Sequence, residues 1–444
     1  MIIDASKGFT KDGKNNKLRA SDIKRIVDVV TARESVCKFS RVVSRDEIRK
    51  NDYNLNIPRY VDSSEEAESW DIYASMFGGL PISEIDKLDK YWKAFPLLRE
   101  ELFENSSKGY CQLAGDDIKK SIKEHSDVKN FEKNFQKAFQ SFDKYLYDKL
   151  IVNINESSIL KSEEVLSGEM FKRLEDIPLI DKYEAYQLLD DDWTEIAVDL
   201  EIIQTEGTEA IKKVDPLMVT KKKGGKEQEV QDGWKGHIIP FELVQNTILS
   251  EEKERIKDKE NRLSEIASEY EEIFDSLTEE EKGFDFVSED GWVISEVKRA
   301  LKSDSIELET KEKLETIAKI NDEEKSLKAE IKTKSASLET KTKDIIENLS
   351  DEQASELLKA KWINPLIQNI MQLPDRIIKE LVANIELLEK KYETTFEEIE
   401  NEITETEKVI SGMIDELEGS ESDMLGLKEL KKLLGGIQND ERKW

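Results

Sequence analysis

Cysteine and histidine are almost absent from this 444-residue sequence, which holds only Cys37, Cys111, His125 and His237. Two cysteines far apart form no CxxC pair and no disulfide framework, which favours a reducing compartment. Two histidines supply neither a His-rich metal site nor a Ser/His/Asp set. We predict that His125 lies inside a helix and His237 in a glycine-flanked strand, and that both are structural.

Long apolar runs are also missing, since the longest is far shorter than the roughly 18 residues that a membrane span needs. The start, Met1 to Asp4, reaches a charge too early for a secretory signal. We therefore expect a soluble, cytoplasmic protein with no membrane partner.

Motifs for phosphate or metal binding are absent or weak. Gly78-Gly79 and Gly224-Gly225 lack the spacing of a phosphate loop, and no GxGxxG occurs. The run Asp190 to Asp192 with Glu195 is either a divalent-cation site or an acidic turn that ends a helix, and we favour the turn. The sequence thus predicts no catalytic residue and no metal site in this chain.

Charge is abundant and unevenly distributed. The net charge is −30, but residues 1–62 carry 14 Lys and Arg against 9 Asp and Glu, a local net of +5, which leaves −35 for the remainder. A polyanion repels an acidic surface. Any contact with a phosphate backbone is therefore expected in the first sixty residues and in small basic islands.

Residues 1–62 are predicted to form the edge of an α/β domain. Strands are expected at Met1 to Ile3 and Phe39 to Val43, and a loop over Lys7 to Lys17. Apolar residues at helical spacing predict a helix with Ser21 as its cap, namely Leu18, Ile23, Ile26, Val27 and Val30. Asp52 to Val61 alternates Tyr53, Leu55 and Ile57 with Asn54 and Asn56, which predicts an extended strand that Pro58 interrupts.

Residues 63–245 form a second, helical and mixed region after an acidic linker at Ser63 to Glu68. A long helix is expected over Asp116 to Val152, where an aromatic stripe at helical spacing indicates core packing rather than a base-stacking platform. Val214 to Thr220 and Glu227 to Val230 predict a hairpin. Its basic tip, made of Lys221, Lys222, Lys223 and Lys226, either touches DNA phosphates or keeps the hairpin soluble.

Residues 246–444 form a third region with coiled-coil patterning. Apolar residues from Ile256 to Leu277 and again from Ile317 to Ile345 recur at steps of three and four, around a break near Gly283 to Trp292. Two such seams predict a long antiparallel helical hairpin. A third seam runs from Ile378 to Leu417. The fold is thus predicted to be mainly α, with an incomplete α/β edge at the N-terminus.

Several segments carry a resemblance to a known family. "MIIDASKGF", "KLRASDIKRIVDVV" and "KFSRVVSRDEIRKNDYNLNIPRYVD" resemble the end of the catalytic domain in type I restriction-modification methyltransferase (M) subunits. "GGLPISEIDKLDKYWKAFPLLR", "PLIDKYEAYQLLDDDWTEIAVDLEIIQTEG" and "VQDGWKGHIIPFELVQ" look like the C-terminal extension of longer members. The resemblance spans nearly the whole chain.

The resemblance implies adenine methylation with S-adenosylmethionine, in a complex with a specificity subunit that reads DNA and a restriction subunit that cuts it. Family chemistry uses a Gly-rich cofactor loop and an Asn-Pro-Pro-aromatic motif that receives a flipped adenine. Neither occurs here, since Asn364-Pro365-Leu366 lacks the second proline and the aromatic. We therefore expect no cofactor in this chain alone. We also expect a non-catalytic C-terminal part from a split, truncated or internally initiated frame or a partial gene prediction, with the missing catalytic half as a partner.

By the same resemblance, Asn54, Asn56, Arg59 and Tyr60 match the family's closing segment. They are expected either to contact DNA, the missing catalytic half or the specificity subunit, or to pack and hydrogen bond at a strand edge. Two alternatives to the whole interpretation stay open: an acidic helical antirestriction protein that mimics DNA, and a gene fragment without function.

Overall fold

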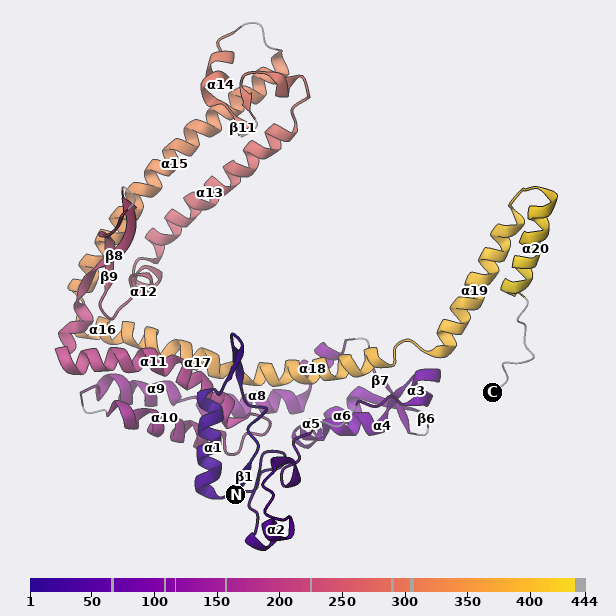
Figure 1. Ribbon diagram of the computed structural model, residues 1–444. Coiled ribbons are helices and arrows are strands. Elements are labelled where there is room, and N and C mark those ends of the chain that lie inside the picture. Colours follow the sequence, from indigo (N-terminus) through magenta and orange to yellow (C-terminus); the bar gives the residue numbers. More distant parts are fainter. Residues whose placement is uncertain are drawn as a thin grey trace. The chain divides into compact units, whose positions relative to one another are not determined.

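The computed structural model describes residues 1–64, 68–107, 109–115, 117–155, 158–223, 226–288, 291–303 and 307–435. The chain is mostly helical with small sheets, as the sequence predicts (Figure 1). It divides into two compact units, Met1–Phe142 with Glu163–Asp191 and Ile367–Trp444, and Asp143–Ser162 with Asp192–Leu366. In the described part, no helix has the length and apolar character needed to cross a membrane.

The first unit begins with short strands around one helix. Strand β1 (Ile2–Ile3) pairs antiparallel with β4 (Ser40–Arg41), and β2 (Thr10–Asp12) forms a hairpin with β3 (Asn15–Lys17) inside the segment expected to be a loop. Helix α1 (Ala20–Ala32) follows β3 and precedes β4 along the chain. Ser21 does not cap it: Arg19 occupies that position, and the Asp22 carboxylate accepts the Arg19 backbone N–H at 2.9 Å.

The prediction of a strand over Asp52 to Val61 is wrong. After helix α2 (Arg45–Lys50) the chain turns through Asp52 and Tyr53, whose φ angles are +54° and +56°, and enters the 3₁₀ helix η1 (Ile57–Arg59). Two consecutive residues in the left-handed region cannot continue a strand. The fixed φ of Pro58 suits the first turn of a helix, so the proline that was expected to interrupt a ladder lies in the first turn of η1 instead.

The main core of the first unit joins segments far apart in the sequence. Helix α18 (Leu373–Lys391) buries Ile378, Leu381 and Ile385 in one cluster with side chains of residues 74–131. That cluster is built on α3 (Ile72–Phe77), α4 (Ile82–Ile85), α5 (Asp89–Ala94), α6 (Leu98–Leu102), α7 (Ile118–Glu124), α8 (Ser126–Phe139) and the sheet β5 (Leu80–Pro81), β7 (Tyr110–Leu113), β6 (Phe103–Ser107).

The long helix expected over Asp116 to Val152 is divided in the structure. His125, expected inside it, separates α7 from α8, and its Nδ1 accepts the Asp127 backbone N–H at 3.1 Å as a cap. Further along are α9 (Phe142–Tyr147) and the π-helix η3 (Asp148–Val152). The core assignment of the aromatic stripe is nevertheless correct, because Phe131, Phe135 and Phe139 are all buried.

A single helix spans the acidic run that was expected to break it. Helix α10 (Ile159–Leu174) is followed by α11 (Lys182–Glu206), and Asp190 to Asp192 lie inside α11. The side chain of Gln187, one turn before, donates to Asp190 and to Asp191, at 3.4 and 2.8 Å. This local amide contact lets the carboxylates stay in a helix, so the acidic run forms no turn.

The second unit contains the predicted long hairpin. Helices α13 (Ser250–Asp275) and α15 (Leu308–Glu347) run side by side in opposite directions (Figure 1). Their direction follows from the ion pairs, since Lys341 faces Glu252, Lys259 faces Glu330 and Arg262 faces Glu323. Strands β10 (Val287–Ser288) and β11 (Gly291–Trp292) with helix α14 (Ile294–Ala300) lie in the connection between them.

The rest of the second unit lies along this hairpin and at its base. Strands β8 (Val214–Lys223) and β9 (Lys226–Gly236) pair as predicted and contact α15, and α12 (Phe241–Thr247) leads into α13. Helix η4 (Thr208–Lys212) precedes β8, and after α15 come α16 (Asp351–Leu358) and the π-helix η6 (Lys359–Ile363).

The third seam continues beyond α18 into another helix of the first unit, α19. Helix α17 (Asn364–Met371) leads into α18, and α19 (Phe396–Asp415) contacts α20 (Glu421–Gly435). The seam therefore divides: its α18 half is buried, whereas its α19 half is exposed at Ile399, Ile403, Ile410, Met413 and Leu417.

Candidate functional site

The segment from Asn54 to Tyr60 is held by hydrogen bonds within itself. The Asn54 side-chain oxygen accepts the Asn56 backbone N–H at 2.9 Å, and the Tyr60 hydroxyl donates to the Asn54 carbonyl at 2.6 Å. The Ile57 carbonyl accepts the backbone N–H groups of Tyr60 and Val61, each at 2.9 Å. An asparagine turn, a 3₁₀ turn and one tyrosine therefore fix this loop without a strand partner.

The four predicted contact residues of this loop separate into two kinds. Tyr60 is 5% exposed, so it anchors the loop and offers no surface to a partner. Asn54, Asn56 and Arg59 are exposed. They lie beside Tyr53 and Leu55, which are each 62% exposed. The structure thus presents a fixed loop whose outer side combines amides, a guanidinium and apolar groups, as recognition loops do.

Helix α1 packs Val29 and several polar side chains against this chain and turns a row of apolar side chains away from it. The Ser21 backbone N–H donates to the Gln187 side chain at 3.0 Å, and the Arg25 guanidinium lies 5.7 Å from the centre of the Tyr183 ring. On the opposite face, Ile23, Val27 and Ile26 form a row that Val30 continues. Three of these are about half exposed: Ile23 at 50%, Val27 at 53% and Val30 at 49%.

That uncovered row is what the sequence interpretation missed. The spacing of Ile23, Val27 and Val30 predicts a helix, but it does not say whether this chain covers the apolar face. The sequence does contain a signal, because the opposite face of the same helix carries long cationic side chains. These side chains pack against the protein: Arg25 lies 4.5 Å from the centre of the Phe39 ring, and Lys24 lies 5.7 Å from the centre of the Phe171 ring. Long cationic side chains cover aromatic rings well and can replace an apolar contact.

Of the four lysines predicted at the tip of the β8–β9 hairpin, Lys221 is the one whose side chain the structure describes. Lys221 is exposed, and its ammonium pairs with Asp232 of the facing strand at 2.9 Å. In register, Lys222 lies opposite Glu227 and Lys223 opposite Lys226, but the side chains of these lysines and the whole of Gly224 and Gly225 lie outside the described residues. DNA contact by this tip stays a prediction, and the acidic residues of β9 reduce its net positive charge.

The remaining titratable candidates form no catalytic group on the described residues. His237 follows β9 and is not in a strand; its Nδ1 lies 2.7 Å from Asp215 and its Nε2 3.4 Å from Glu206, and the Asp215 hydrogen bond raises the pKa of His237. Across the part of the chain that the structure describes, no three His, Cys, Asp or Glu side chains are placed to hold a metal ion.

Comparison with known proteins relates one end of the chain to a known family. Residues 1–69 match the family model described as N-6 DNA Methylase. The type I restriction enzyme MpnII methylase subunit of Mycoplasma pneumoniae is 39% identical over 71 residues, which are 16% of this chain and 13% of that protein. No solved structure matches.

Two archaeal relatives extend the similarity slightly. The type I restriction enzyme MjaVII methylase subunit of Methanocaldococcus jannaschii is 41% identical over 93 residues, 20% of this chain and 16% of that protein. The MjaVIII methylase subunit of the same organism is 34% identical over 108 residues, 23% of this chain and 18% of that protein. The alignments thus cover less than a fifth of each relative. The resemblance to type I methylase subunits is confirmed over this short part of the chain.

Proposed function

We propose that this chain, a relative of type I restriction enzyme methylase subunits, acts as an assembly part of a type I restriction-modification complex. Its first 62 residues complete an adenine methyltransferase domain whose catalytic motifs are supplied by another polypeptide segment. Its helices bind the specificity subunit, and DNA and the restriction subunit are engaged within the same complex. The single observation that carries this proposal is the uncovered apolar row of α1, which lies within the residues that match the N-6 DNA methylase family model.

An uncovered aliphatic row on a helix is unusual for a surface that faces only water. Burying one such side chain contributes about 1.5–3 kcal/mol, so a row of three is a strong docking element. The fixed loop that presents Tyr53 and Leu55 belongs to the same matched segment. In the family that this segment resembles, these residues close the catalytic domain. The partner that would cover the apolar row is therefore the remainder of that catalytic domain.

The residues of this segment do not suit the binding of S-adenosylmethionine by themselves. The turn after β1 is formed by Asp4, whose carboxylate accepts the Ser6 backbone N–H at 3.0 Å and the Ser63 hydroxyl. This turn is closed by side chains and lacks a Gly-rich loop whose backbone could approach a cofactor. We therefore assign no methyl-transfer step to these residues. The cofactor belongs to the segment that carries the family motifs.

A specificity subunit would meet the apolar seam of α19. The exposed positions Ile399, Ile403 and Ile410 repeat at heptad spacing, and α20 leaves them uncovered. Such a seam fits a partner helix that lays its own apolar face along it.

The proposal is tested by assembly with a methyltransferase segment that carries the Gly-rich loop and the Asn-Pro-Pro-aromatic motif, taken from a type I methylase subunit. We expect the full chain to co-purify with that segment and the specificity subunit, and the complex to transfer a labelled methyl group from S-adenosylmethionine to adenine in DNA. Ile23→Glu with Val27→Glu should weaken association at least about tenfold, because two aliphatic contacts are replaced by buried carboxylates.

A matched control is Val165→Glu with Val198→Glu, because both valines are about half exposed on other helices. This control should leave assembly unchanged. Methyl transfer by this chain alone, or equal loss of assembly in both double variants, would overturn the proposal. If the chain instead inhibits a complete type I enzyme and the inhibition disappears at high salt, the acidic DNA-mimic alternative is correct.

A further inference from the structure

Helix α3 and the residues just before it present a large apolar surface to solvent. Ala74 of α3 is fully buried, so this short helix packs a small side chain on the core and turns its large ones outward. The exposed fractions of these large side chains run from 41% to 77%. So many large apolar groups close together on a surface indicate an interaction site. The α3 surface consists of Trp70, Ile72, Tyr73, Met76 and Phe77.

The α3 surface is held in one arrangement by the chain around it. The Asp71 side chain caps α3 by accepting the Ala74 backbone N–H at 2.9 Å, and the Asp71 backbone N–H donates to the Tyr392 hydroxyl at 3.0 Å. The Tyr110 hydroxyl donates to the Asp71 carboxylate at 3.0 Å, and its ring centre lies 4.7 Å from that of Tyr73. A surface that is already ordered loses little conformational freedom on binding.

A second segment of the chain runs along α3 in the same direction. Tyr392 contacts Asp71 at the start of α3, and Thr395 packs against Gly78 at its end. The segment then leads into α19, which contacts α3. Phe396, the first residue of α19, is 67% exposed and extends the apolar surface. All these residues belong to the first compact unit, so the surface is formed within one body of the protein.

Both segments are acidic and contain no basic residue. Residues 60–86 hold seven Asp and Glu, residues 392–407 hold another seven, and neither range contains Lys or Arg. The ammonium of Lys391, which lies 5.2 Å from the centre of the Trp70 ring, is neutralised by Glu84 at 3.0 Å. The α3 surface therefore combines apolar contact with net negative charge.

That charge decides which partner fits. A second copy would bring another acidic chain, since residues 63–444 carry a net charge of −35. A nucleic acid would bring phosphates, so both are repelled at this surface. A partner that carries lysine or arginine beside its apolar side chains is attracted, because carboxylates pair with these cations and aromatic rings accept them.

We propose that the α3 surface is the docking site for a basic amphipathic helix of a partner protein. The apolar stripe of that helix lies against Ile72, Met76 and Phe77, and cationic side chains along the edges of the stripe face the carboxylates. The α3 surface lies outside residues 1–69, which match the methylase family model, and it does not use the seam of α19. The proposal is therefore independent of the proposed function.

Fluorescence anisotropy of the full chain with labelled peptides of about three heptads tests the proposal at near-physiological salt. One peptide places leucine along one helical face and lysine on both sides of it. A second has the same composition with leucine spread around the helix, and a third has glutamate in place of lysine. The first should bind at least about tenfold more tightly than the others. Equal binding of the two lysine peptides would show general attraction to an acidic protein and overturn the proposal.

Two double variants test the surface itself. Ile72→Ser with Phe77→Ser should weaken binding of the first peptide about tenfold or more, because two apolar contacts are lost while the charge is unchanged. Glu393→Gln with Glu397→Gln should weaken it about threefold, and less at high salt, because these exposed carboxylates are screened. All four side chains are exposed, so both variants should keep the fold, which thermal unfolding checks.

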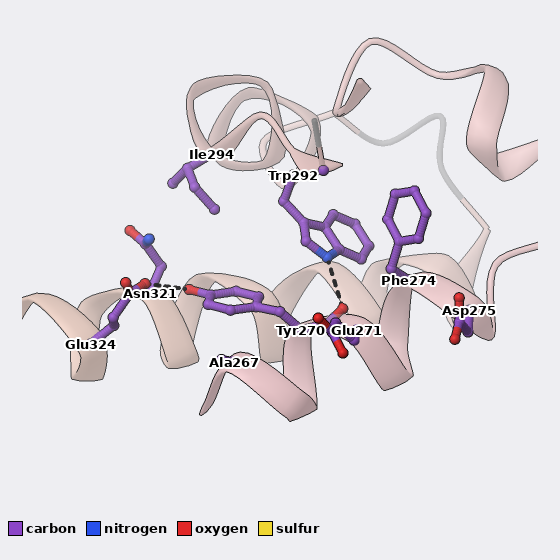
Figure 2. Close-up of a pocket in the computed structure, with 10 residues that line it drawn as sticks. Ala267, Tyr270, Glu271, Phe274, Asp275, Trp292, Ile294, Asn321 and Glu324 are labelled. Atoms are coloured by element: carbon purple, nitrogen blue, oxygen red, sulfur yellow. Dashed lines mark hydrogen bonds between the residues drawn. The ribbon is translucent and has the colours of Figure 1, made fainter. Parts of the chain in front are cut away.

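The control removes exposed apolar side chains far from α3 in the sequence. At the connected end of the α13–α15 hairpin, Trp292 and Tyr270 line a cavity of about 560 Å³, and the Trp292 indole N–H donates to the Tyr270 carbonyl at 3.2 Å (Figure 2). Phe284 of the same connection is 51% exposed, close to the 54% of Phe77. Phe284→Ser with Val165→Ser thus removes one aromatic and one aliphatic side chain and should change peptide binding by less than about twofold.

Equal weakening by the two serine double variants, or unchanged binding in Ile72→Ser with Phe77→Ser, would overturn the proposal. Two further outcomes would replace the partner helix with another occupant. Self-association of the chain that Ile72→Ser with Phe77→Ser abolishes would identify a second copy. Binding of a single-stranded oligonucleotide that the same variant abolishes would identify a nucleic acid.

Discussion

Glu281 is a buried carboxylate that ties the hairpin connection to α15. Its side chain accepts the Thr278 backbone N–H at 2.8 Å and the Thr310 hydroxyl at 2.8 Å, and it lies 3.3 Å from the Lys313 ammonium. These contacts, the Thr278 backbone hydrogen bond foremost, lower the pKa of Glu281 to about 2. A carboxylate whose pKa is lower in the folded state stabilises the fold above its unfolded pKa of 4.5.

That stabilisation is lost as the pH falls from about 4.5 toward 2, because in this range the unfolded chain takes up a proton at Glu281 while the folded state still holds the carboxylate ionised. Glu281→Gln should lower the free energy of unfolding at pH 7 by about 2 kcal/mol, through loss of charged hydrogen bonds. It should also flatten the decline in stability below pH 4.5. Urea unfolding at pH 7 and pH 3 measures both effects. The exposed neighbour Glu280 is the control: Glu280→Gln should keep the wild-type pH dependence, and identical curves for the two variants would contradict this assignment.

The loop from Asp52 to Val61 shows how a few residues with turn preferences can override an alternating pattern. Alternation of apolar and polar side chains predicted a strand. The backbone instead follows the positive φ angles of Asp52 and Tyr53 and the hydrogen bond from Tyr60 to Asn54. Asparagine, aspartate and proline all favour turns through local bonds and fixed angles. Over ten residues these local terms exceeded the alternation, which needs a neighbouring strand to have any effect.

At the scale of elements, the π-helix η6 contributes Lys361 to a buried ion pair with Asp199 of α11. Lys361 contacts Asp199 of α11 at 2.5 Å and donates to the Ile238 carbonyl at 2.9 Å, while the Trp362 indole N–H donates to Asp199 at 2.8 Å. Asp199 is buried, as is the Trp362 ring. One carboxylate therefore accepts hydrogen bonds from two successive side chains of this short helix.

Removing this carboxylate should be costly. Asp199→Ala removes the nearer carboxylate from a buried ammonium, which keeps only the exposed Glu195 at 3.7 Å and the Ile238 carbonyl, and should lower the free energy of unfolding by about 3–5 kcal/mol. Lys361→Met in the same chain should restore part of the loss, since the unpaired charge is gone. Chemical denaturation of the single and double variants gives the coupling energy.

An exposed ion pair serves as the control for the buried pair of Lys361 and Asp199. Lys298 and Asp322 lie 2.8 Å apart on the surface of the hairpin. Asp322→Ala should leave the free energy of unfolding almost unchanged, because solvent screens exposed ion pairs. Similar losses for Asp199→Ala and Asp322→Ala would show that the η6 pair is not effectively buried.

Elements were predictable where one periodicity dominated. The hairpin of strands β8 and β9 follows from two β-like runs on either side of Gly224-Gly225, and the hairpin of α13 and α15 follows from apolar steps of three and four. Breaks were not predictable from charge alone, because Asp190 to Asp192 continue α11, whereas His125 ends one helix and caps the next. A helix boundary depends on whether the backbone groups find partners, which neighbouring side chains decide.

At the scale of the molecule, sequence could not show which apolar seams would be covered. Ile378 to Leu388 and Ile399 to Leu417 have the same spacing, yet the first is buried against residues 74–131 and the second is exposed. The difference is set by long-range packing.

The exposed seam of α19 and the net charge of −30 should oppose each other in solution. The helix carries many carboxylates beside its apolar positions, among them Glu397, Glu400 and Glu407, so copies of the chain repel. Raising the salt from about 0.05 to 0.5 M shortens the screening length from about 14 Å to about 4 Å and leaves the apolar attraction in place. Sedimentation velocity should therefore show monomers at low salt and growing self-association at high salt.

Ile403→Asp with Met413→Asp should abolish that association, because both side chains lie on the seam and are exposed. Asn401→Asp with Thr404→Asp adds the same charge to the same helix away from the seam and should leave most of the association intact. If association weakened as salt rose, charge pairing rather than the apolar seam would hold the copies together. The seam would then also lose its support as the contact for a specificity subunit.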